Sequence, residues 1–301
     1  MKALLVIDSN ALLHRAFHAL PPLTTKKGEP TGAVYGFLLA LFRVIKDIKP
    51  HYVAACFDSA APTFRKEKFK EYKANRPKTP DELVCQIHKT KEVLDALGIP
   101  HFAKDGIEAD DLIATICQKM SAKKDLMTYI LTGDLDNLQL VSENVKVYTL
   151  GKGIKDIVVY NKEKIAERFK ITPEQVIDFK ALTGDASDNI PGVPGVGEKT
   201  ASALLQKFGN LENVFKNIED DSIKPSIKKA LAENKERAFL AKELVQMKKD
   251  VDMDFDLKVF GSSFDESGIS DLFKSLEFFT MIDRAGEIMK NKPIKKQSKL
   301  L

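Results

Sequence analysis

Residues 3–8 read ALLVID, a short apolar run that ends on the carboxylate of Asp8. The same arrangement recurs in YVAACFD at 52–58 and in TYILTGD at 128–134. Continuous apolar runs of this length are typical of strands that are buried on both faces of a parallel sheet. Ligands of open α/β sheets bind outside the carboxyl ends of such strands. The three runs therefore predict one sheet edge that carries Asp8, Asp58 and Asp134.

Strand-like and helix-like segments alternate over roughly the first 160 residues. Alternation of this kind predicts an α/β fold with a mostly parallel central sheet flanked by helices. Besides the strand at 3–8, strands are expected at 52–58, near 127–133, 145–149 and 156–160, and helices at 10–19, 33–48, 81–97 and 108–122.

Near residue 161 the pattern changes to consecutive helices. They are expected at 161–169, 174–182, 197–208, about 224–248 and 268–276. The chain length permits two domains, and we predict an α/β core at 1–172 followed by an α-helical domain at 173–290. The basic tail 291–301 is predicted to be disordered.

Six further acids accompany the three at the strand ends. An apolar helical pattern begins with Glu108, Asp110 and Asp111. Because the positive end of a helix favours acids, capping of this helix is an alternative role for the three side chains. Asp136, Asp185 and Asp188 complete the set. Two carboxylates ~4 Å apart repel by roughly 1 kcal/mol in water and ~4 kcal/mol at an effective dielectric of 20. Convergence would therefore require counter-charge, and all-oxygen ligation selects Mg²⁺ or Mn²⁺.

The stretch 62–80, PTFRKEKFKEYKANRPKTP, holds seven basic residues against two acidic ones. Phe64, Phe69 and Tyr72 are interleaved with the cations. Bases stack on aromatic faces while Lys and Arg bind phosphates, so this composition suits single-stranded nucleic acid. A solvated amphipathic helix is the alternative, although the stretch must leave the sheet directly beside Asp58.

A glycine-rich motif, GVPGVGEKTA at 192–201, precedes the helical pattern of SALLQKFG. Glycines allow close backbone approach, and the free N–H groups of a helix start bind phosphate. Lys199 adds a positive charge. The motif therefore predicts a helix–hairpin–helix element on duplex DNA. The spacing of a P-loop is absent, so ATP use is not expected.

Composition and the absence of certain patterns argue against a zinc-binding, a secreted or a membrane-spanning protein. The formal net charge is +4, and 44% of the residues are hydrophobic. The cysteines Cys56, Cys85 and Cys117 form no CxxC pair, which argues against a zinc site and favours a reducing cytoplasm. No signal peptide is recognised at the N-terminus, and no apolar run approaches the ~20 residues of a membrane span.

These motifs together resemble the 5′-nuclease (flap endonuclease) family, and in particular the 5′→3′ exonuclease domain of bacterial DNA polymerase I. The resemblance is carried by VIDSNALLHRAF, FDSAAPTFRKEKFKEYKANRPKTP, GIEADDLIAT, LTGDLDNLQLV, FKALTGDASDNIPGVPGVGEKTASALLQKFG and LFKSLEFFTMIDR. It implies a PIN-like nuclease core, a helical arch at about 62–90, and a C-terminal DNA-binding domain. That domain would hold a helix–three-turn–helix (H3TH) motif at about 181–209.

The resemblance also implies roles for individual residues. Two or more Mg²⁺ or Mn²⁺ ions would be held by Asp8, Asp58, Glu108, Asp110, Asp111, Asp134, Asp136, Asp185 and Asp188. Arg15 and Lys73 would contact the reacting phosphate, and Asp134 would lie between the ion positions. Nucleic acid would be bound by Arg65, Tyr72, Lys73, Arg76, Gly192, Val193, Gly195, Gly197, Lys199 and Thr200. A K⁺ ion is a further candidate ligand of the H3TH hairpin.

Two departures from the family pattern stand out. The family's usual DKDLYQL is replaced by DLDNLQL at 134–140, which keeps both acids but changes the intervening positions, and Phe279 stands where the family has Arg. The first departure puts local packing or substrate contacts in question rather than metal binding.

The expected function is a Mg²⁺-dependent 5′→3′ exonuclease and flap endonuclease. It would hydrolyse DNA and RNA primers during lagging-strand synthesis and repair. The expected substrates are 5′ flaps, nicks, gaps and RNA primer–DNA hybrids. A DNA polymerase is an expected partner of a monomeric protein in the bacterial cytoplasm, at the nucleoid. A PIN-like ribonuclease and a catalytically silent DNA-junction binder are the alternatives, and the presence of all nine acids argues against the second.

Overall fold

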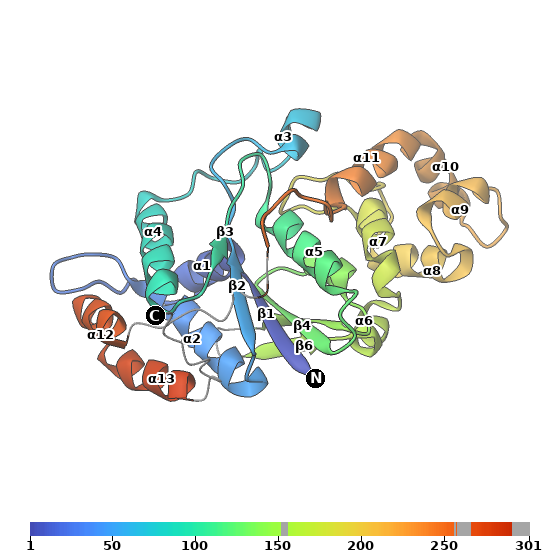
Figure 1. The fold of residues 1–301 in the computed structure, drawn as a ribbon. Coiled ribbons are helices and arrows are strands. Elements are labelled where there is room, and N and C mark those ends of the chain that lie inside the picture. The colour runs from blue at the N-terminus through green and yellow to red at the C-terminus, as the bar shows by residue number, and fades with distance from the viewer. Residues whose placement is uncertain (152–155, 256, 258–265, 291–301) are drawn as a thin grey trace.

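The computed structural model describes residues 1–151, 156–255, 257 and 266–290. Its α/β part is built on one sheet with the strand order β3-β2-β1-β4-β5-β6 (Figure 1). The strands are β1 (Lys2–Asp8), β2 (Tyr52–Cys56), β3 (His101–Phe102), β4 (Leu126–Thr132), β5 (Val145–Leu150) and β6 (Ile157–Tyr160). All neighbours pair in parallel except β5 and β6. The expectation of a mostly parallel sheet is therefore confirmed, although the short β3 was not expected.

The central strand β1 is buried on both faces, as its unbroken apolar sequence predicts. Leu4 and Val6 belong to one hydrophobic core, whereas Leu5 and Ile7 belong to the other. This division follows from the strand geometry, in which successive side chains point to opposite faces. One core is therefore built on each side of the sheet.

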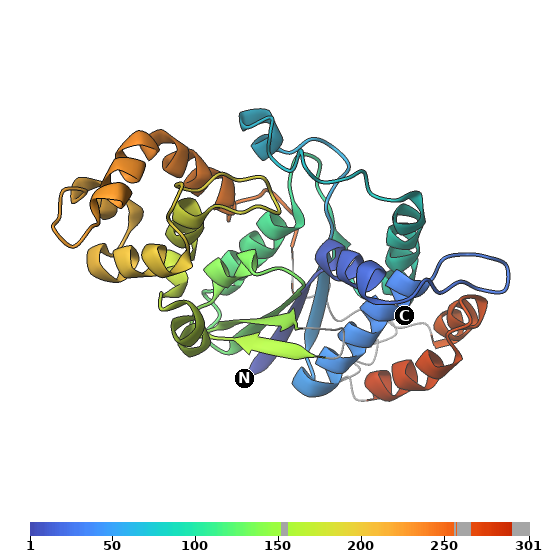
Figure 2. The same ribbon diagram turned by 180° about the vertical axis from the view of Figure 1, so that it is seen from behind.

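Helices cover both faces of the sheet (Figures 1 and 2). The first core receives side chains from α5 (Ala109–Met120), and the second receives them from α1 (Ser9–Ala19), α2 (Gly32–Ile48) and α4 (Asp81–Ala96). The long connection from β2 to α4 contains only the five-residue helix α3 (Phe64–Lys68). The expected arch at 62–90 is therefore not a continuous helix: most of 62–80 is non-helical, and 81–90 belong to α4.

A second group of helices follows the sheet, as expected. It comprises α6 (Lys162–Phe169), α7 (Val176–Thr183), α8 (Glu198–Phe208), α9 (Leu211–Lys216), α10 (Pro225–Glu233) and α11 (Lys235–Val245), and short 3₁₀ turns lie at Asp136–Leu140 and Pro173–Gln175. The single helix expected at 224–248 is instead two helices that meet at Asn234, whose φ of −122° and ψ of 22° interrupt the helical backbone. None of the helices in the described residues is both long and apolar enough to cross a membrane.

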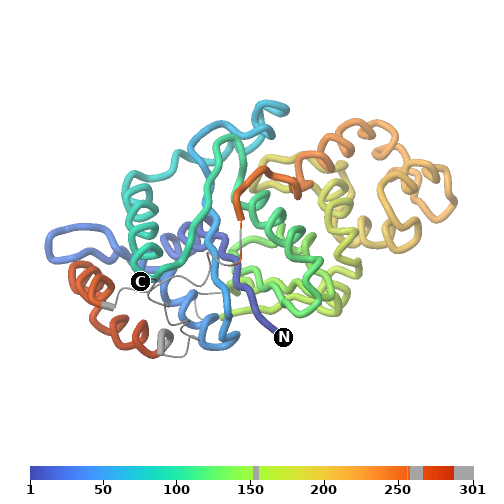
Figure 3. Tube along the Cα trace, in the orientation of Figure 1, coloured from blue at the N-terminus to red at the C-terminus, as the bar shows by residue number. Residues whose placement is uncertain are grey.

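The last two helices, α12 (Glu266–Ser275) and α13 (Phe279–Lys290), lie beside α2 and α4 rather than beside α7–α11 (Figure 3). Phe273 packs against Phe42, and Phe278 packs edge-on against Tyr35. The domain expected at 173–290 therefore includes helices that do not pack with the rest of it. The apolar side chains of α12 and α13 instead complete the hydrophobic core on the sheet face that α2 covers. The predicted disordered tail 291–301 lies outside the described residues.

Candidate active site

The sheet edge expected from the sequence carries the Asp8 carboxylate at the end of β1. One Asp8 oxygen caps α1 by accepting the Ala11 N–H at 3.1 Å, and the other accepts the Thr132 hydroxyl at 2.6 Å. Thr132 ends β4, the parallel neighbour of β1. These two hydrogen bonds hold Asp8 at the sheet edge from which Asp134, just after the end of β4, also emerges.

Four of the nine acids form no ion pair within the described part of the chain: Asp8, Asp58, Asp110 and Asp134. Their hydrogen-bond donors are uncharged. The Ala109 N–H donates to Asp58 at 2.8 Å, and the Asn137 amide donates to Asp110 at 2.8 Å. We call these four side chains the unpaired carboxylates.

The unpaired carboxylates repel one another. Burial, followed by the charges of Asp58 and Asp134, raises the pKa of Asp8 to about 7. Burial, followed by the charges of Asp8 and Asp134, raises the pKa of Asp110 well above its ordinary value. Such shifts mark a site that lacks positive charge and is stabilised either by protons or by a bound cation.

The donor set fits a hard divalent cation, because every candidate ligand is a carboxylate oxygen. No three His, Cys, Asp or Glu side chains among the described residues are grouped closely enough to hold an ion as they stand. Mg²⁺ commonly retains several waters and takes only one or two carboxylates directly. The unpaired carboxylates are therefore compatible with a hydrated ion.

The other five acids each have a basic partner. The ammonium group of Lys73 lies 3.1 Å from Glu108 and 3.7 Å from Asp188, and Arg76 also pairs with Asp188. Burial alone would lower the pKa of Lys73, but the charges of Glu108 and Asp188 outweigh burial and raise this pKa. Protein cations thus already neutralise this half of the cluster.

Lys180 on α7 is a member of the site that sequence reasoning missed. It pairs with Asp136 and, at 2.7 Å, with Asp185. Burial of Asp185 would raise its pKa, but Lys180 lowers it to about 2. The available signal was a lysine about one helical turn before the Gly184-Asp185 turn, a spacing too common to single it out.

Asp111 is not available to a metal ion in this structure, contrary to expectation. Arg65 donates to both Asp111 oxygens at 2.8 Å, one oxygen also accepts the Lys248 N–H at 2.8 Å, and the other accepts the Glu108 N–H at 3.3 Å. A carboxylate offers about four acceptor positions, and all four are used. Asp111 is therefore part of a structural ion pair, and the expectation that it ligates metal is corrected.

Two residues expected to contact nucleic acid are buried instead. Arg65 is 3% exposed and also donates to the carbonyl groups of Leu244 and Gln246. Tyr72 is 3% exposed, and its hydroxyl lies 3.0 Å from Glu108 and 3.2 Å from Asp188. The charge and aromatic pattern of 62–80 suggested a surface, but these two side chains join the arch to the acids beneath it.

The turn at 71–76 lies against the loop at 185–189. The Lys73 N–H donates to the Asp188 carbonyl at 2.8 Å, and Asn75 donates to the Ala186 carbonyl at 2.8 Å. Asn189 reaches back to the carbonyl of Glu71, also at 2.8 Å. These contacts place Lys73 and Arg76 over the acids.

Arg15 has a different partner from the one expected. It lies on α1 and donates to the carbonyl oxygen of Gly151, just after β5. No ion pair joins its guanidinium to an acid within the described residues. Its predicted contact with the reacting phosphate therefore remains a prediction.

The glycine-rich hairpin at 192–197 joins α7 to α8 in the expected position. A Cβ atom on Gly192 would lie 2.3 Å from the Thr183 carbonyl carbon, so this glycine permits the close approach of the hairpin to α7. Gly195 has a φ of +80°, and a Cβ there would meet nothing within 4 Å. Lys199 is exposed in the first turn of α8, whose start has no side-chain cap.

Not every expected hairpin contact is equally accessible. Val193 is 3% exposed, and its N–H donates to the Leu182 carbonyl. Its side chain and N–H are therefore unavailable to nucleic acid, which is a correction to the expected contact. Gly195, Gly197 and Lys199 are exposed, and Thr200 is half-buried.

Comparison with known proteins places the chain in a family. Residues 3–170 match the 5′-3′ exonuclease N-terminal resolvase-like domain, and residues 171–265 match the 5′-3′ exonuclease C-terminal SAM fold. DNA polymerase I of Bacillus subtilis (strain 168) is 41% identical over 288 residues, which are 95% of this chain and 32% of the relative. DNA polymerase I of Mycobacterium tuberculosis (strain H37Rv) is 40% identical over 284 residues, 93% of this chain and 31% of the relative.

Solved structures share the fold. T5 5′-exonuclease with bound zinc has a TM-score of 0.66 at 21% identity, covering 96% of this chain and 99% of that one. The catalytic core of Rad2 in complex with DNA substrate has a TM-score of 0.64 at 17% identity, covering 96% and 92%. The chain spans about a third of the length of the curated relatives that it matches. From the family models and the relatives together, we conclude that the chain belongs to the 5′-3′ exonuclease family.

Proposed function

We propose that this chain is a Mg²⁺-dependent, structure-specific 5′ nuclease with both 5′→3′ exonuclease and flap-endonuclease activity. The observation that carries the proposal is the group of unpaired carboxylates, where burial and then mutual repulsion raise the pKa of Asp8 and Asp110. They lie beside the basic turn at 71–76, which provides cations for a phosphate. Family membership supplies the reaction class.

The unpaired carboxylates would hold the first ion. Glu108, Asp136, Asp185 and Asp188 would contribute to a second ion position once Lys73, Arg76 and Lys180 release them. When bound, Mg²⁺ or Mn²⁺ ions lower the pKa of a bound water and stabilise the attacking and leaving oxygens of an in-line displacement.

The chain's own cations would act on the scissile phosphate. Lys73 and Arg76 are held over the acid cluster by Glu108 and Asp188. On release they would face a phosphate bound at the same place, where a positioned cation stabilises the charge that develops in the transition state. Arg15 is a further candidate for this role. No side chain is required to act as the nucleophile.

The H3TH hairpin would hold the duplex part of the substrate away from the acids. The exposed backbone at Gly195 and Gly197, the uncapped start of α8 and Lys199 suit a phosphate group. A K⁺ ion at the hairpin carbonyl groups belongs to the same proposal. Because the matched relatives are DNA polymerases I, we further propose that the chain acts with a polymerase, as a monomer in the bacterial cytoplasm, in removing primers and flaps.

A cleavage assay on matched substrates tests the proposal. A 5′-flap duplex, a gapped duplex and single-stranded RNA would be incubated with Mg²⁺, with Mn²⁺ and with chelator. Cleavage of the flap and gapped DNA that requires a divalent ion supports the proposal. Preferred cleavage of single-stranded RNA would favour a PIN-like ribonuclease, and tight flap binding without cleavage would favour a junction-binding protein.

A further inference from the structure

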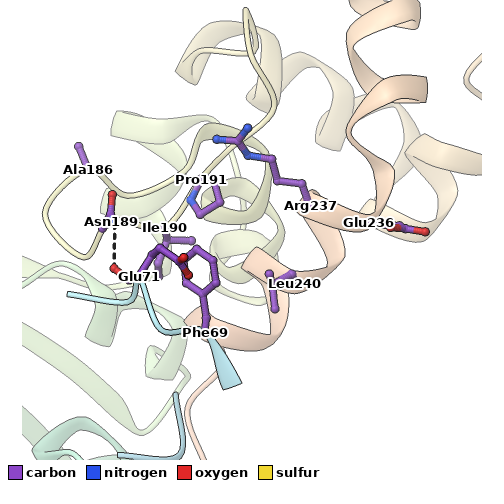
Figure 4. A pocket seen from close by; sticks show the side chains of 9 residues that line it. All are labelled: Phe69, Glu71, Ala186, Asn189, Ile190, Pro191, Glu236, Arg237 and Leu240. Carbon is purple, nitrogen blue, oxygen red and sulfur yellow. Dashed lines mark hydrogen bonds between the residues drawn. The ribbon is translucent and has the colours of Figure 1, made fainter. Parts of the chain in front are cut away.

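A cavity of about 690 Å³ lies between the arch, the loop at 186–191 and α11 (Figure 4). Three parts of the chain form its walls. Phe69 and Glu71 come from the arch, Ile190 and Pro191 from the loop after the acids, and Leu240 from α11. The Asn189 amide joins the first two walls by donating to the Glu71 carbonyl at 2.8 Å.

Arg237 of α11 stands where this cavity meets a second one of about 480 Å³ at the glycine-rich hairpin. It lines both cavities, and its side chain extends toward Pro191 in Figure 4, whereas the side chain of Glu236 points away. The side chain of Arg237 is exposed and forms no hydrogen bond or ion pair within the part of the chain that the structure describes. A guanidinium group in this position is free to bind a phosphate.

We propose that the Phe69–Leu240 cavity binds one unpaired nucleotide of the DNA substrate, with the base on the apolar walls and its phosphate on Arg237. The inference rests on the proposed function. Arg237 lines both this cavity and the one at the hairpin, and Glu71 lines this one, so the cavity connects the hairpin with the turn at 71–76. Phe69 and Pro191 offer flat apolar surfaces to a base, and the Glu71 carboxylate offers an acceptor to an exocyclic amino group. Glu71 would repel a phosphate, which places the phosphate at the Arg237 end.

Binding of a 5′-flap duplex with Ca²⁺ in place of Mg²⁺ tests the site. An abasic nucleotide would be moved step by step through the junction between single and double strand. Stacking contributes roughly 1–3 kcal/mol per base, so removal of the base at one position should weaken binding to the native protein by about fivefold or more. Phe69→Leu keeps apolar volume but removes the aromatic face, and should make that position much less sensitive.

Arg237→Gln tests the phosphate end with an exposed side chain whose replacement leaves the core intact. It should weaken flap binding and reduce the slope of log affinity against log salt by about 1. Lys235→Gln is the matched control, because it removes one charge from the same helix outside the cavity. Its effect should be clearly smaller.

Different results would contradict the cavity proposal and the proposed function on which it rests. If the native protein cleaves flaps with Mg²⁺ but the abasic scan is flat, or if Phe69→Leu keeps the full sensitivity, the cavity does not bind a base. Equal effects of Arg237→Gln and Lys235→Gln would show that Arg237 contributes only general charge. If the native protein neither binds nor cleaves flap DNA, the proposed function itself is wrong, and the cavity proposal with it.

Discussion

Arg65 and Asp111 form a two-pronged ion pair in which both nitrogen–oxygen distances are 2.8 Å, and the two side chains are 3% and 0% exposed. The pair connects three segments, since Arg65 belongs to the base of the arch, Asp111 to α5, and their remaining bonds go to the backbone at 244–248. It therefore fixes where the arch begins relative to Glu108, three residues before Asp111.

Removal of Arg65 alone should be strongly destabilising. Arg65→Met leaves Asp111 buried without its counter-charge, and breaking a buried pair in this way costs about 3–5 kcal/mol of the free energy of unfolding. Urea denaturation measures the change. Arg43→Met is the matched control, because the Arg43–Asp47 pair is exposed and should contribute less than about 1 kcal/mol. Partial recovery in the double variant Arg65→Met/Asp111→Leu would agree with this account. A cost for Arg65→Met as small as that for Arg43→Met would contradict it.

Asp134→Asn should abolish cleavage while leaving flap binding largely intact. Asp134 is one of the unpaired carboxylates, so its loss weakens the proposed metal site without changing the basic surface. Single-turnover cleavage in saturating Mg²⁺ and flap binding in Ca²⁺ are the two measurements. Near-normal turnover in the variant would show that Asp134 is not required for the metal-dependent step.

Mg²⁺ should stabilise the protein more at pH 8 than at pH 5. The pKa of Asp8 rises from 3.8 to about 7 in the folded protein, so the folded chain binds this proton more tightly than the unfolded chain. Its contribution to stability is full below about pH 4 and is lost as the pH rises to about 7. Above pH 7 the repulsion is present, and a bound ion relieves it.

Thermal melting with and without Mg²⁺ at the two pH values measures this effect. In chelator at pH 8, Asp110→Asn should raise the melting temperature by a few degrees, because it removes one repelling charge while the amide oxygen still accepts from Asn137. The same variant should lose most of the Mg²⁺-induced rise. A Mg²⁺ effect that is independent of pH, and unchanged in Asp110→Asn, would place the ion elsewhere.

Lys73→Ala should lower the single-turnover cleavage rate by about 100-fold, with a much smaller loss of affinity. A positioned cation contributes most where charge develops in the transition state. Rates at saturating enzyme separate this effect from binding. If the loss appears in affinity and the saturated rate is unchanged, Lys73 only helps to hold the substrate.

Duplex binding at the hairpin should depend on the backbone conformation of the hairpin as well as on its charge. Lys199→Ala should weaken duplex binding for any sequence and reduce the salt slope by roughly 1. Gly195→Val should do more damage, because Gly195 has a φ of +80° that a β-branched residue rarely adopts. The space that an added Cβ would occupy is open, so backbone strain rather than a steric collision would cause the loss of binding.

Gly197→Ala serves as the control for this pair of variants. Gly197 has a φ of −87°, and an added Cβ would meet nothing within 4 Å. Duplex binding should therefore change little. Binding titrated across salt in Ca²⁺ measures all three variants. Unchanged affinity and slope for Lys199→Ala, together with a changed slope for Lys73→Ala, would move the duplex site from the hairpin to the arch.

Most of the longer elements and the sheet edge could be predicted from the sequence because their signals are local, whereas β3, α9 and α13 were not expected. Apolar runs such as ALLVID are long enough for a strand and end on the acid that the edge presents. The bounds of α2 and α8 differ by only one residue at their starts from those expected. The expected helix at 224–248 was wrong because the apolar pattern continues through Asn234, whereas the backbone does not.

The tertiary structure alone decided how the acids divide. All nine were identified from the sequence, which treats them alike, yet the structure leaves four unpaired and gives five a basic partner. Several of these partners come from distant positions, since Arg65 and Asp111 are 46 residues apart and Arg76 and Asp188 are 112 apart, whereas Lys180 and Asp185 are 5 apart. A carboxylate's charge state and free acceptor positions depend on which groups surround it in space, and periodicity along a chain carries no information about those groups.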